Sequence, residues 1–324
     1  MSGTPRPHPF MPETPVSSLR LVFAGSPDAA VPSLRAISDS RHDVVAVVTR
    51  EDSPRGRRRE LSPTSVAVAA ADLGVPILKT DRLTAEVTEQ ITALRPDLGV
   101  IVAFGALVRE PLLSVPRLGW INLHFSLLPR WRGAAPVQRA IIAGDEITGA
   151  AVFQLVPGLD AGAVFGEITE PIGRMQTAGH LLDTLSLSGA QLLVRTIDQI
   201  ADGTAEARPQ AGDATLAPKL TLDDGRIDWT RAAELVHDLI RGVTPEPGAH
   251  TMIGGDRLKV LAATIARDAP RLAPGELVHE NKRLHAGTAT DAIELLIVQP
   301  AGKKAMAAAD WWRGRPADAV AVAT

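Results

Sequence analysis

The stretch INLHFSLLPRWRGAAPVQ, residues 121–138, begins as an apolar strand and then changes character abruptly. Asn122 and His124 stand two residues apart where the apolar run ends, and a proline-bounded turn leads into a patch of arginine and tryptophan. Side chains two positions apart on a strand point to the same side of a sheet. Packing alone does not require this order, so we interpret the stretch as a strand end that carries a functional site.

The sequence around this stretch alternates between strand and helix signals. Helical patterns separate four apolar runs that we interpret as strands, at residues 19–25, 44–49, 75–78 and 97–105. The alternation predicts an α/β fold with an open, mostly parallel sheet over residues 19–202. Ligands of such sheets bind beyond the carboxyl ends of the strands. Asn122 and His124 would lie at that edge.

Two local signals refine this picture. The run SPTSVAVAAADLG (62–74) predicts a helix with Ser62 as its N-cap, Pro63 just inside and Gly74 as its stop. The first predicted turn, FAGSPDAA (23–30), lacks the GxGxxG pattern. A dinucleotide-binding fingerprint is therefore missing.

The composition changes after the predicted sheet. Residues 203–218 are small and polar and predict a linker, and short β-type runs broken by glycine and proline predict a smaller β-rich domain at 219–324. Residues 1–18 are rich in proline and serine, and we expect them to form a flexible extension.

Composition excludes several classes of protein. The 324 residues contain no cysteine, which excludes disulfides, thiolate catalysis and cysteine-ligated zinc. No apolar run approaches the ~18 residues of a membrane span, and we expect a cytoplasmic protein. The net charge of −3 argues against a general nucleic-acid binder.

Asn122, His124 and Asp160 are the candidate catalytic residues. An asparagine amide can donate a hydrogen bond to a developing oxyanion, and a histidine exchanges protons near neutral pH. Asp160 lies between Gly158 and Gly162, where a sharp turn could present its carboxylate to the imidazole. Spacing alone leaves a structural role for His124 and Asp160 open. No second histidine stands at ligand spacing, so we expect no metal.

The segment REDSPRGRRRE, residues 50–60, carries five arginines and three acidic residues. Long loops of this kind are either functional or disordered. On charge alone, a solvated loop and a binding element both remain open.

Four motifs give the chain a resemblance to methionyl-tRNA formyltransferases, a family that uses 10-formyltetrahydrofolate. The resemblance runs from about Leu19 to the end of the chain, and its motifs are FAGSPDAAVPSL, IVAFGALV, INLHFSLLPRWRGAAPVQ and GLDAG. It implies a Rossmann-like formyltransferase fold followed by an OB-like β-barrel that grips tRNA.

The resemblance also implies roles for individual residues. It matches Asn122, His124 and Asp160 to the catalytic trio of the family, with a protonated His124 that stabilises the oxyanion beside Asp160. The remaining matches are a folate-binding loop at Ser126, Leu127, Leu128 and Pro129, a pterin pocket lined by Leu107 and Val108, and a tRNA-binding loop at Arg57, Arg58 and Arg59.

The implied reaction moves a formyl group from 10-formyltetrahydrofolate to the α-amine of methionine on initiator tRNA, without a metal. A formyltransferase acting on an amino sugar nucleotide is the alternative within this chemistry. A folate-binding regulator without turnover and a non-catalytic tRNA-binding module are alternatives of other classes. We expect a monomer.

Overall fold

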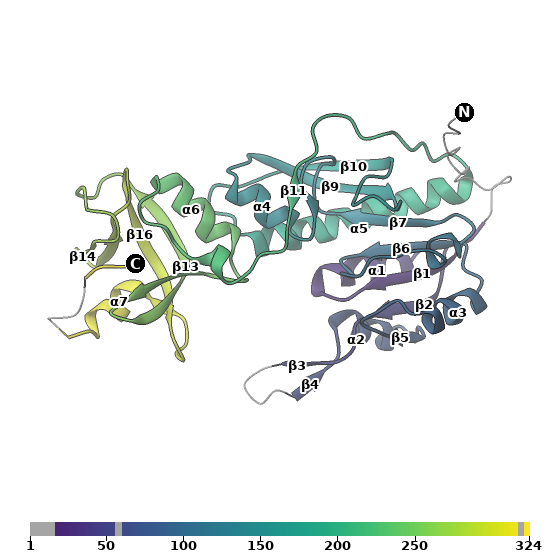
Figure 1. Ribbon diagram of the computed structural model, residues 1–324, viewed down its shortest axis with the longest axis horizontal. Helices are drawn as coiled ribbons and strands as arrows, with labels where there is room; N and C mark the ends of the chain where they lie inside the picture. The colour runs from purple at the N-terminus through teal and green to yellow at the C-terminus, as the bar shows by residue number, and fades with distance from the viewer. Residues whose placement is uncertain (1–16, 56–59, 317–320) are drawn as a thin grey trace. The chain divides into compact units, whose positions relative to one another are not determined.

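A seven-stranded sheet with the order β10-β9-β7-β6-β1-β2-β5 carries the predicted site (Figure 1). The neighbours from β5 to β7 are parallel, and β9 is antiparallel to β7. The prediction of an open, mostly parallel sheet is therefore confirmed. The strands are β1 (Arg20–Gly25), β2 (Asp43–Thr49), β5 (Ile77–Lys79), β6 (Leu98–Val102), β7 (Trp120–His124), β9 (Ile147–Gln154) and β10 (Val164–Pro171).

This computed structural model describes residues 17–55, 60–316 and 321–324. The chain forms two compact units, the first made of residues up to 132, 149–170 and 183–216, and the second of 133–148, 171–182 and 217–324. None of the described helices is long and apolar enough to cross a membrane.

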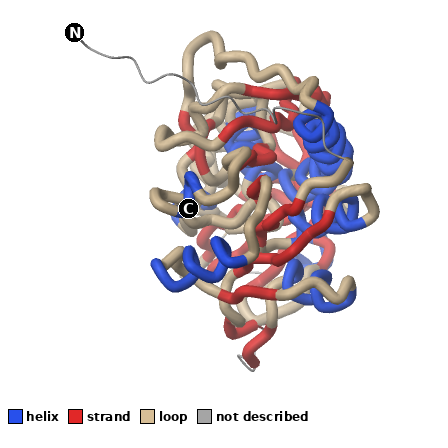
Figure 2. The backbone as a smooth tube through the Cα atoms, turned by 90° about the vertical axis from the view of Figure 1, so that its right-hand side faces the viewer, coloured by secondary structure: helices blue, strands red, loops and turns tan. Residues whose placement is uncertain are grey.

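Helices flank the strands of the first unit (Figure 2). They bury their apolar faces, since Leu34, Ile37 and Ile91 are inaccessible to solvent. The helices are α1 (Val31–Ser38), α2 (Ser65–Asp72), α3 (Ala85–Ala93) and the long α5 (Ala178–Asp202).

Strands β6 and β7 pair a glycine with a tryptophan, Gly99 with Trp120. Trp120 is buried, and a Cβ added at Gly99 would lie 2.1 Å from its indole ring. The indole Nε1 donates to the carbonyl oxygen of Leu112 at 3.0 Å, so this buried polar group is paired. Strand β7 can carry this large side chain because Gly99, its partner on β6, has no side chain.

Helix α2 begins later than predicted. Its N-cap is Thr64, whose Oγ1 accepts a hydrogen bond from the Ala67 amide at 3.0 Å and lies 2.7 Å from Oγ1 of Thr49. The prediction of Ser62 as the cap is wrong, because the threonine tied to the end of β2 takes that role.

Ser62 instead ends a short hairpin. Strands β3 (Ser53–Arg55) and β4 (Glu60–Ser62) pair antiparallel. The strands that precede and follow residues 56–59 therefore pair with each other. Arg57, Arg58 and Arg59 lie outside the described residues.

The second unit holds an antiparallel sheet with the order β12-β13-β16-β15-β14, with β17 beside β16. Helix α6 (Ala233–Gly242) and the shorter α7 (Ala308–Arg313) belong to the same unit. The prediction of a smaller C-terminal β domain is confirmed. The strands are β12 (Ala249–Ile253), β13 (Asp256–Ala266), β14 (Leu277–Glu280), β15 (Arg283–Ala286), β16 (Ala292–Pro300) and β17 (Met306–Ala307).

The last four residues, 321–324, close this sheet. Met252 on the β12 edge exchanges backbone hydrogen bonds with Thr324 at 2.8 and 2.9 Å. On the β14 edge, the Leu277 amide donates to Ala321, and the Ala323 amide donates to Gly275. One segment therefore pairs with both edges, which gives the unit its barrel-like closure.

Candidate active site

Asn122 and His124 lie at the carboxyl end of strand β7, at the carboxyl edge of the sheet. Asn122 is paired with Ile101 on β6 and Phe153 on β9, and His124 is paired with Ala151 on β9. The two side chains share one side of the strand. Asn122 is half-buried and His124 is 6% exposed.

Both ring nitrogens of His124 have a partner. Nε2 lies 2.8 Å from the carbonyl oxygen of Trp131, and Nδ1 lies 3.8 Å from Oδ2 of Asp160. A carbonyl can only accept, so Nε2 carries the hydrogen and donates it. The imidazole and the ring of Phe153 also lie edge to face, with centroids 6.3 Å apart and planes at 86°. The ring is held from three sides.

Burial lowers the pKa of His124 below its ordinary value, although the charge of Asp160 and the Trp131 carbonyl act in the opposite direction. The resting imidazole is therefore neutral at pH 7, with an unprotonated Nδ1 that faces Asp160. This differs from the expected protonated histidine, because desolvation outweighs the attraction of a carboxylate at 3.8 Å. Such a ring can accept a proton and then share its charge with Asp160.

A tight turn presents Asp160. Its φ of 44° lies in the left-handed region, which residues with a Cβ rarely adopt. A Cβ at Gly162 would lie only 1.6 Å from the carbonyl oxygen of Gln154, so the backbone after Asp160 passes close to β9. The aspartate side chain is 12% exposed.

The side-chain oxygen of Asn122 is buried and has no hydrogen-bond partner among the described residues. An unpaired buried acceptor costs about 1–3 kcal/mol. A bound molecule that supplies an N–H or O–H group would remove this cost.

The loop after His124 is mostly buried and is held by an internal hydrogen bond. Ser126 is inaccessible to solvent, and its hydroxyl donates to the carbonyl oxygen of Arg130 at 2.6 Å. Leu128 and Pro129 are buried and Leu127 is half-buried. Ser126 shapes the turn and is not presented as a nucleophile.

The structure separates Leu107 from Val108. Leu107 is 65% exposed, whereas Val108 is 9% exposed and packs in the core with Phe104 and Leu112. Leu107 can touch a ligand directly, and Val108 supports the loop from below.

The sequence did not point to Trp131, Arg132 or Gln210. Trp131 takes part through its backbone carbonyl and has a φ of 60°, and neither property can be inferred from a tryptophan in a sequence. Gln210 lies in the predicted linker, but its side chain contacts both Arg132 and the turn that holds Asp160.

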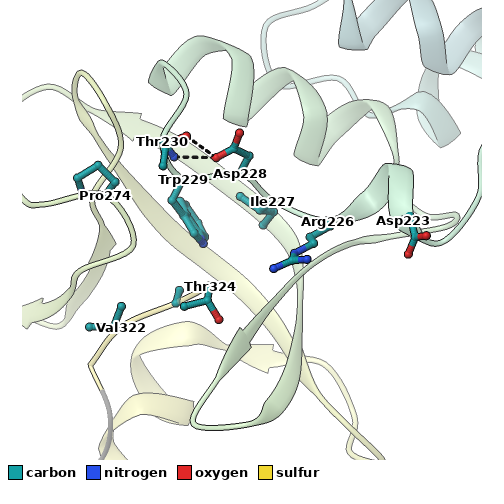
Figure 3. A pocket seen from close by; sticks show the side chains of 10 residues that line it. Asp223, Arg226, Ile227, Asp228, Trp229, Thr230, Pro274, Val322 and Thr324 are labelled. Carbon is teal, nitrogen blue, oxygen red and sulfur yellow. Dashed lines mark hydrogen bonds between the residues drawn. The ribbon is translucent and has the colours of Figure 1, made fainter.

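A separate pocket of about 600 Å³ lies in the second unit (Figure 3). Arg226, Trp229 and Thr324 are among its lining residues. Asp228 accepts hydrogen bonds from the hydroxyl and amide of Thr230, which lower the pKa of Asp228. None of the predicted catalytic residues lines this pocket.

Comparisons with known proteins agree with this architecture. Residues 19–197 match the formyl transferase family, and residues 219–316 match the formyl transferase C-terminal domain. A methionyl-tRNA formyltransferase of Clavibacter sepedonicus is 58% identical over 91% of this chain and 97% of the relative. One of Leifsonia xyli is 57% identical over 93% and 99% of the two chains.

The chain belongs to the methionyl-tRNA formyltransferase family. The predicted family is confirmed, and the protein is an enzyme of the formyl-transfer class. The same fold occurs in an N-formyltransferase of Helicobacter canadensis, solved with folinic acid and dTDP-3-aminofucose. That structure is 17% identical, has a TM-score of 0.64, and is matched over 87% of this chain and 99% of its own.

Within this formyltransferase, the described residues include no group of three or more histidine, cysteine, aspartate or glutamate side chains arranged to hold a metal ion.

Proposed function

We propose that this formyltransferase moves the formyl group of 10-formyltetrahydrofolate to the α-amine of methionine on initiator tRNA. The observation that carries the proposal is the arrangement of His124, whose Nε2 donates to Trp131 while Nδ1 faces Asp160. Membership in the methionyl-tRNA formyltransferase family supports the choice of acceptor. Because charged tRNA is used by ribosomes, we place the reaction in the cytoplasm.

The proposed reaction requires positioning more than activation. An α-amine has a pKa near 8, so about a tenth of it is neutral at pH 7. Holding the amine against the formyl carbon can lower the barrier by about 7–11 kcal/mol. A carbon–nitrogen bond forms to the amine, the bond from the formyl carbon to N10 breaks, the amine loses a proton and N10 gains one.

Asn122 would serve both reacting groups. Its amide N–H groups donate to the carbonyl oxygen as negative charge develops there, and its unpartnered Oδ1 accepts a hydrogen from the amine. Both interactions come from one side chain on a buried strand, so the reacting atoms are held together.

His124 would take the proton that the amine loses. Its pKa is lowered by burial, so the ring is unprotonated and can act as a base. The charge that it gains is then stabilised by Asp160 on one side and by the Trp131 carbonyl on the other. Return of this proton to N10 would restore the neutral ring.

The loop at residues 126–129 and the exposed Leu107 are the residues that we assign to folate. The turn that the Ser126 hydroxyl stabilises offers backbone groups and apolar side chains of the kind that line small-molecule sites. The structure of the Helicobacter canadensis protein with folinic acid supports a folate site in this fold.

We assign tRNA binding to the arginine-rich hairpin and to the second unit. Guanidinium groups such as those of Arg57, Arg58 and Arg59 bind phosphates through paired donors. From Arg208 onward the chain has fifteen basic and fifteen acidic residues, so a basic face requires segregation of charge. The hairpin therefore contributes much of the attraction to the acceptor end.

Formylation of three acceptors tests the proposal. Purified protein and 10-formyltetrahydrofolate are mixed with methionylated initiator tRNA, methionylated elongator tRNA, or a dTDP-amino sugar. Rapid blocking of the amine only on initiator tRNA supports the proposal, and preferred formylation of the sugar would overturn it. Binding of folate or tRNA without any product would instead indicate a regulator or a binding module.

A further inference from the structure

We propose that Gln210 is a positioning residue that fixes Asp160 and the Trp131 carbonyl on either side of the His124 ring. Its place in the chain, between the two domains matched by the family, gives it no predicted catalytic role. The inference rests on the proposed function, because positioning matters only if His124 carries the proton.

The side-chain amide of Gln210 donates two hydrogen bonds and accepts two. Its Nε2 donates to the carbonyl oxygens of Asp160 at 2.7 Å and Gly162 at 2.8 Å. Its Oε1 accepts from Nη2 of Arg132 at 2.5 Å and from Nε at 3.2 Å. Carbonyl oxygens only accept and a guanidinium only donates, so an amide is the side-chain group that satisfies both sides.

These contacts close a ring of five residues, which we call the contact ring. Asp160 faces Nδ1 of His124, whose Nε2 donates to Trp131. Trp131 is joined through the chain to Arg132, Arg132 donates to Gln210, and Gln210 returns to Asp160. The distance between the two partners of the imidazole is therefore set by Gln210.

The contact ring explains how the turn at Asp160 is maintained. A residue with a Cβ at a φ of 44° persists only where its surroundings hold it. Two hydrogen bonds from Gln210 grip the carbonyls of Asp160 and Gly162, one on each side of Ala161. The carboxylate is thereby aimed at His124.

Thr215, which follows Gln210 in the same segment, holds Trp131 on the other side of the His124 ring. Oγ1 of Thr215 accepts from the Trp131 amide at 2.9 Å, and the Thr215 amide donates to Pro129 at 3.3 Å. Arg208 pairs with Val164 through two backbone hydrogen bonds of 2.8 Å. The segment around Gln210 thus has a fixed position from which the amide can act.

Two variants test the proposal. Gln210→Glu keeps the shape and the contact with Arg132 but sets an oxygen against two carbonyl oxygens, and Gln210→Ala removes all four contacts. Moving a catalytic group by about 1 Å can lower the rate by up to about 100-fold. We expect kcat to fall about 10- to 100-fold in both variants, with KM for folate and tRNA unchanged. Glu206→Gln is the matched control, because it also exchanges a carboxylate and an amide, but at an exposed position.

Titration of the His124 ring, followed by NMR, separates positioning from general stability. In Gln210→Ala the carboxylate of Asp160 is no longer held near Nδ1, so the pKa of His124 moves further down. Wild-type kcat in Gln210→Glu, or a lower kcat with an unchanged His124 titration in Gln210→Ala, would overturn the proposal. The titration needs no substrate, so it tests the contact ring even if wild-type protein formylates no tRNA.

Discussion

At the scale of single residues, the site is governed by the environment of one imidazole. His124 has a nearby carboxylate, yet its pKa is lowered because burial is the larger influence. The position of a strand end and a glycine-framed turn made Asn122, His124 and Asp160 candidates, and the family resemblance implied their catalytic roles. The sequence could not identify the Trp131 carbonyl or the protonation state, because both depend on how the loop folds back over the ring.

Removing the Asn122 amide should slow catalysis strongly. We expect Asn122→Ala to lower kcat by about 100- to 1,000-fold, because a donor to the developing oxyanion is lost. Stability should not fall, since the Asn122 oxygen has no hydrogen-bond partner among the described residues. Steady-state kinetics and urea unfolding measure the two effects, and kcat within threefold of wild type would contradict the assigned role.

The titration of His124 should follow its burial. In wild-type protein the ring should titrate below its ordinary pKa of about 6.5, and Asp160→Asn should lower the pKa further because the carboxylate charge is lost. Because the pKa of His124 is lowered in the folded wild-type protein, this protein binds fewer protons at His124 than the unfolded chain does near that pKa. This residue's contribution to stability is therefore present above pH 6.5 and lost as the pH falls.

NMR of the imidazole protons across a pH series measures this pKa directly. A pKa above 6.5 in wild-type protein, or a higher pKa in Asp160→Asn, would show that burial is not the dominant influence.

At the scale of elements, strong hydrophobic patterns predicted the buried strands well, whereas tertiary contacts decide where the elements begin and end. The buried strands β1, β2, β6 and β7 were predicted because both faces of a parallel strand are apolar. The start of α2 was wrong by two residues because Thr64 is tied to the end of β2. The hairpin β3–β4 was missed, since charged residues and a proline give no strand signal.

The hairpin should contribute the salt-dependent part of tRNA affinity. Changing Arg57, Arg58 and Arg59 together to serine removes up to three phosphate contacts. We expect KM for tRNA to rise and the slope of log KM against log salt to fall by about 1 to 3. Steady-state kinetics from low to moderate salt measure this slope.

The hairpin variant needs a control of equal charge. Serine at the exposed positions Arg35, Arg82 and Arg195 removes the same charge from other surfaces. An equal loss of slope in this control would show that net charge, and not the hairpin, holds the tRNA.

At the scale of the whole molecule, the chain forms two units of different construction, and residues 133–148 and 171–182 join the second unit although they lie within the predicted first domain. The change in composition after residue 202 indicated the second unit, and the short β-type runs indicated its class. The sequence could not show that residues 321–324 pair with both edges of its sheet, because pairing of distant edges leaves no periodic signal.

Deleting residues 321–324 should open the sheet of the second unit. Four backbone hydrogen bonds to Met252, Gly275 and Leu277 are lost, which at about 0.5–1.5 kcal/mol each amounts to roughly 2–6 kcal/mol. The amides of Met252 and Leu277 should exchange with solvent faster, while those of β6 and β7 keep their protection. Val322→Ala, which preserves the backbone pairing, is the control, and equal protection in the truncated protein would contradict closure.

The most direct test of the account is a single turnover with enzyme in excess over methionylated initiator tRNA. With 10-formyltetrahydrofolate present, the account predicts that every methionine amine becomes formylated and that one formyl donor is consumed for each blocked amine. His124→Ala should slow this step by about 100-fold or more. An amine that stays free, or an equal rate in the His124 variant, would contradict the account.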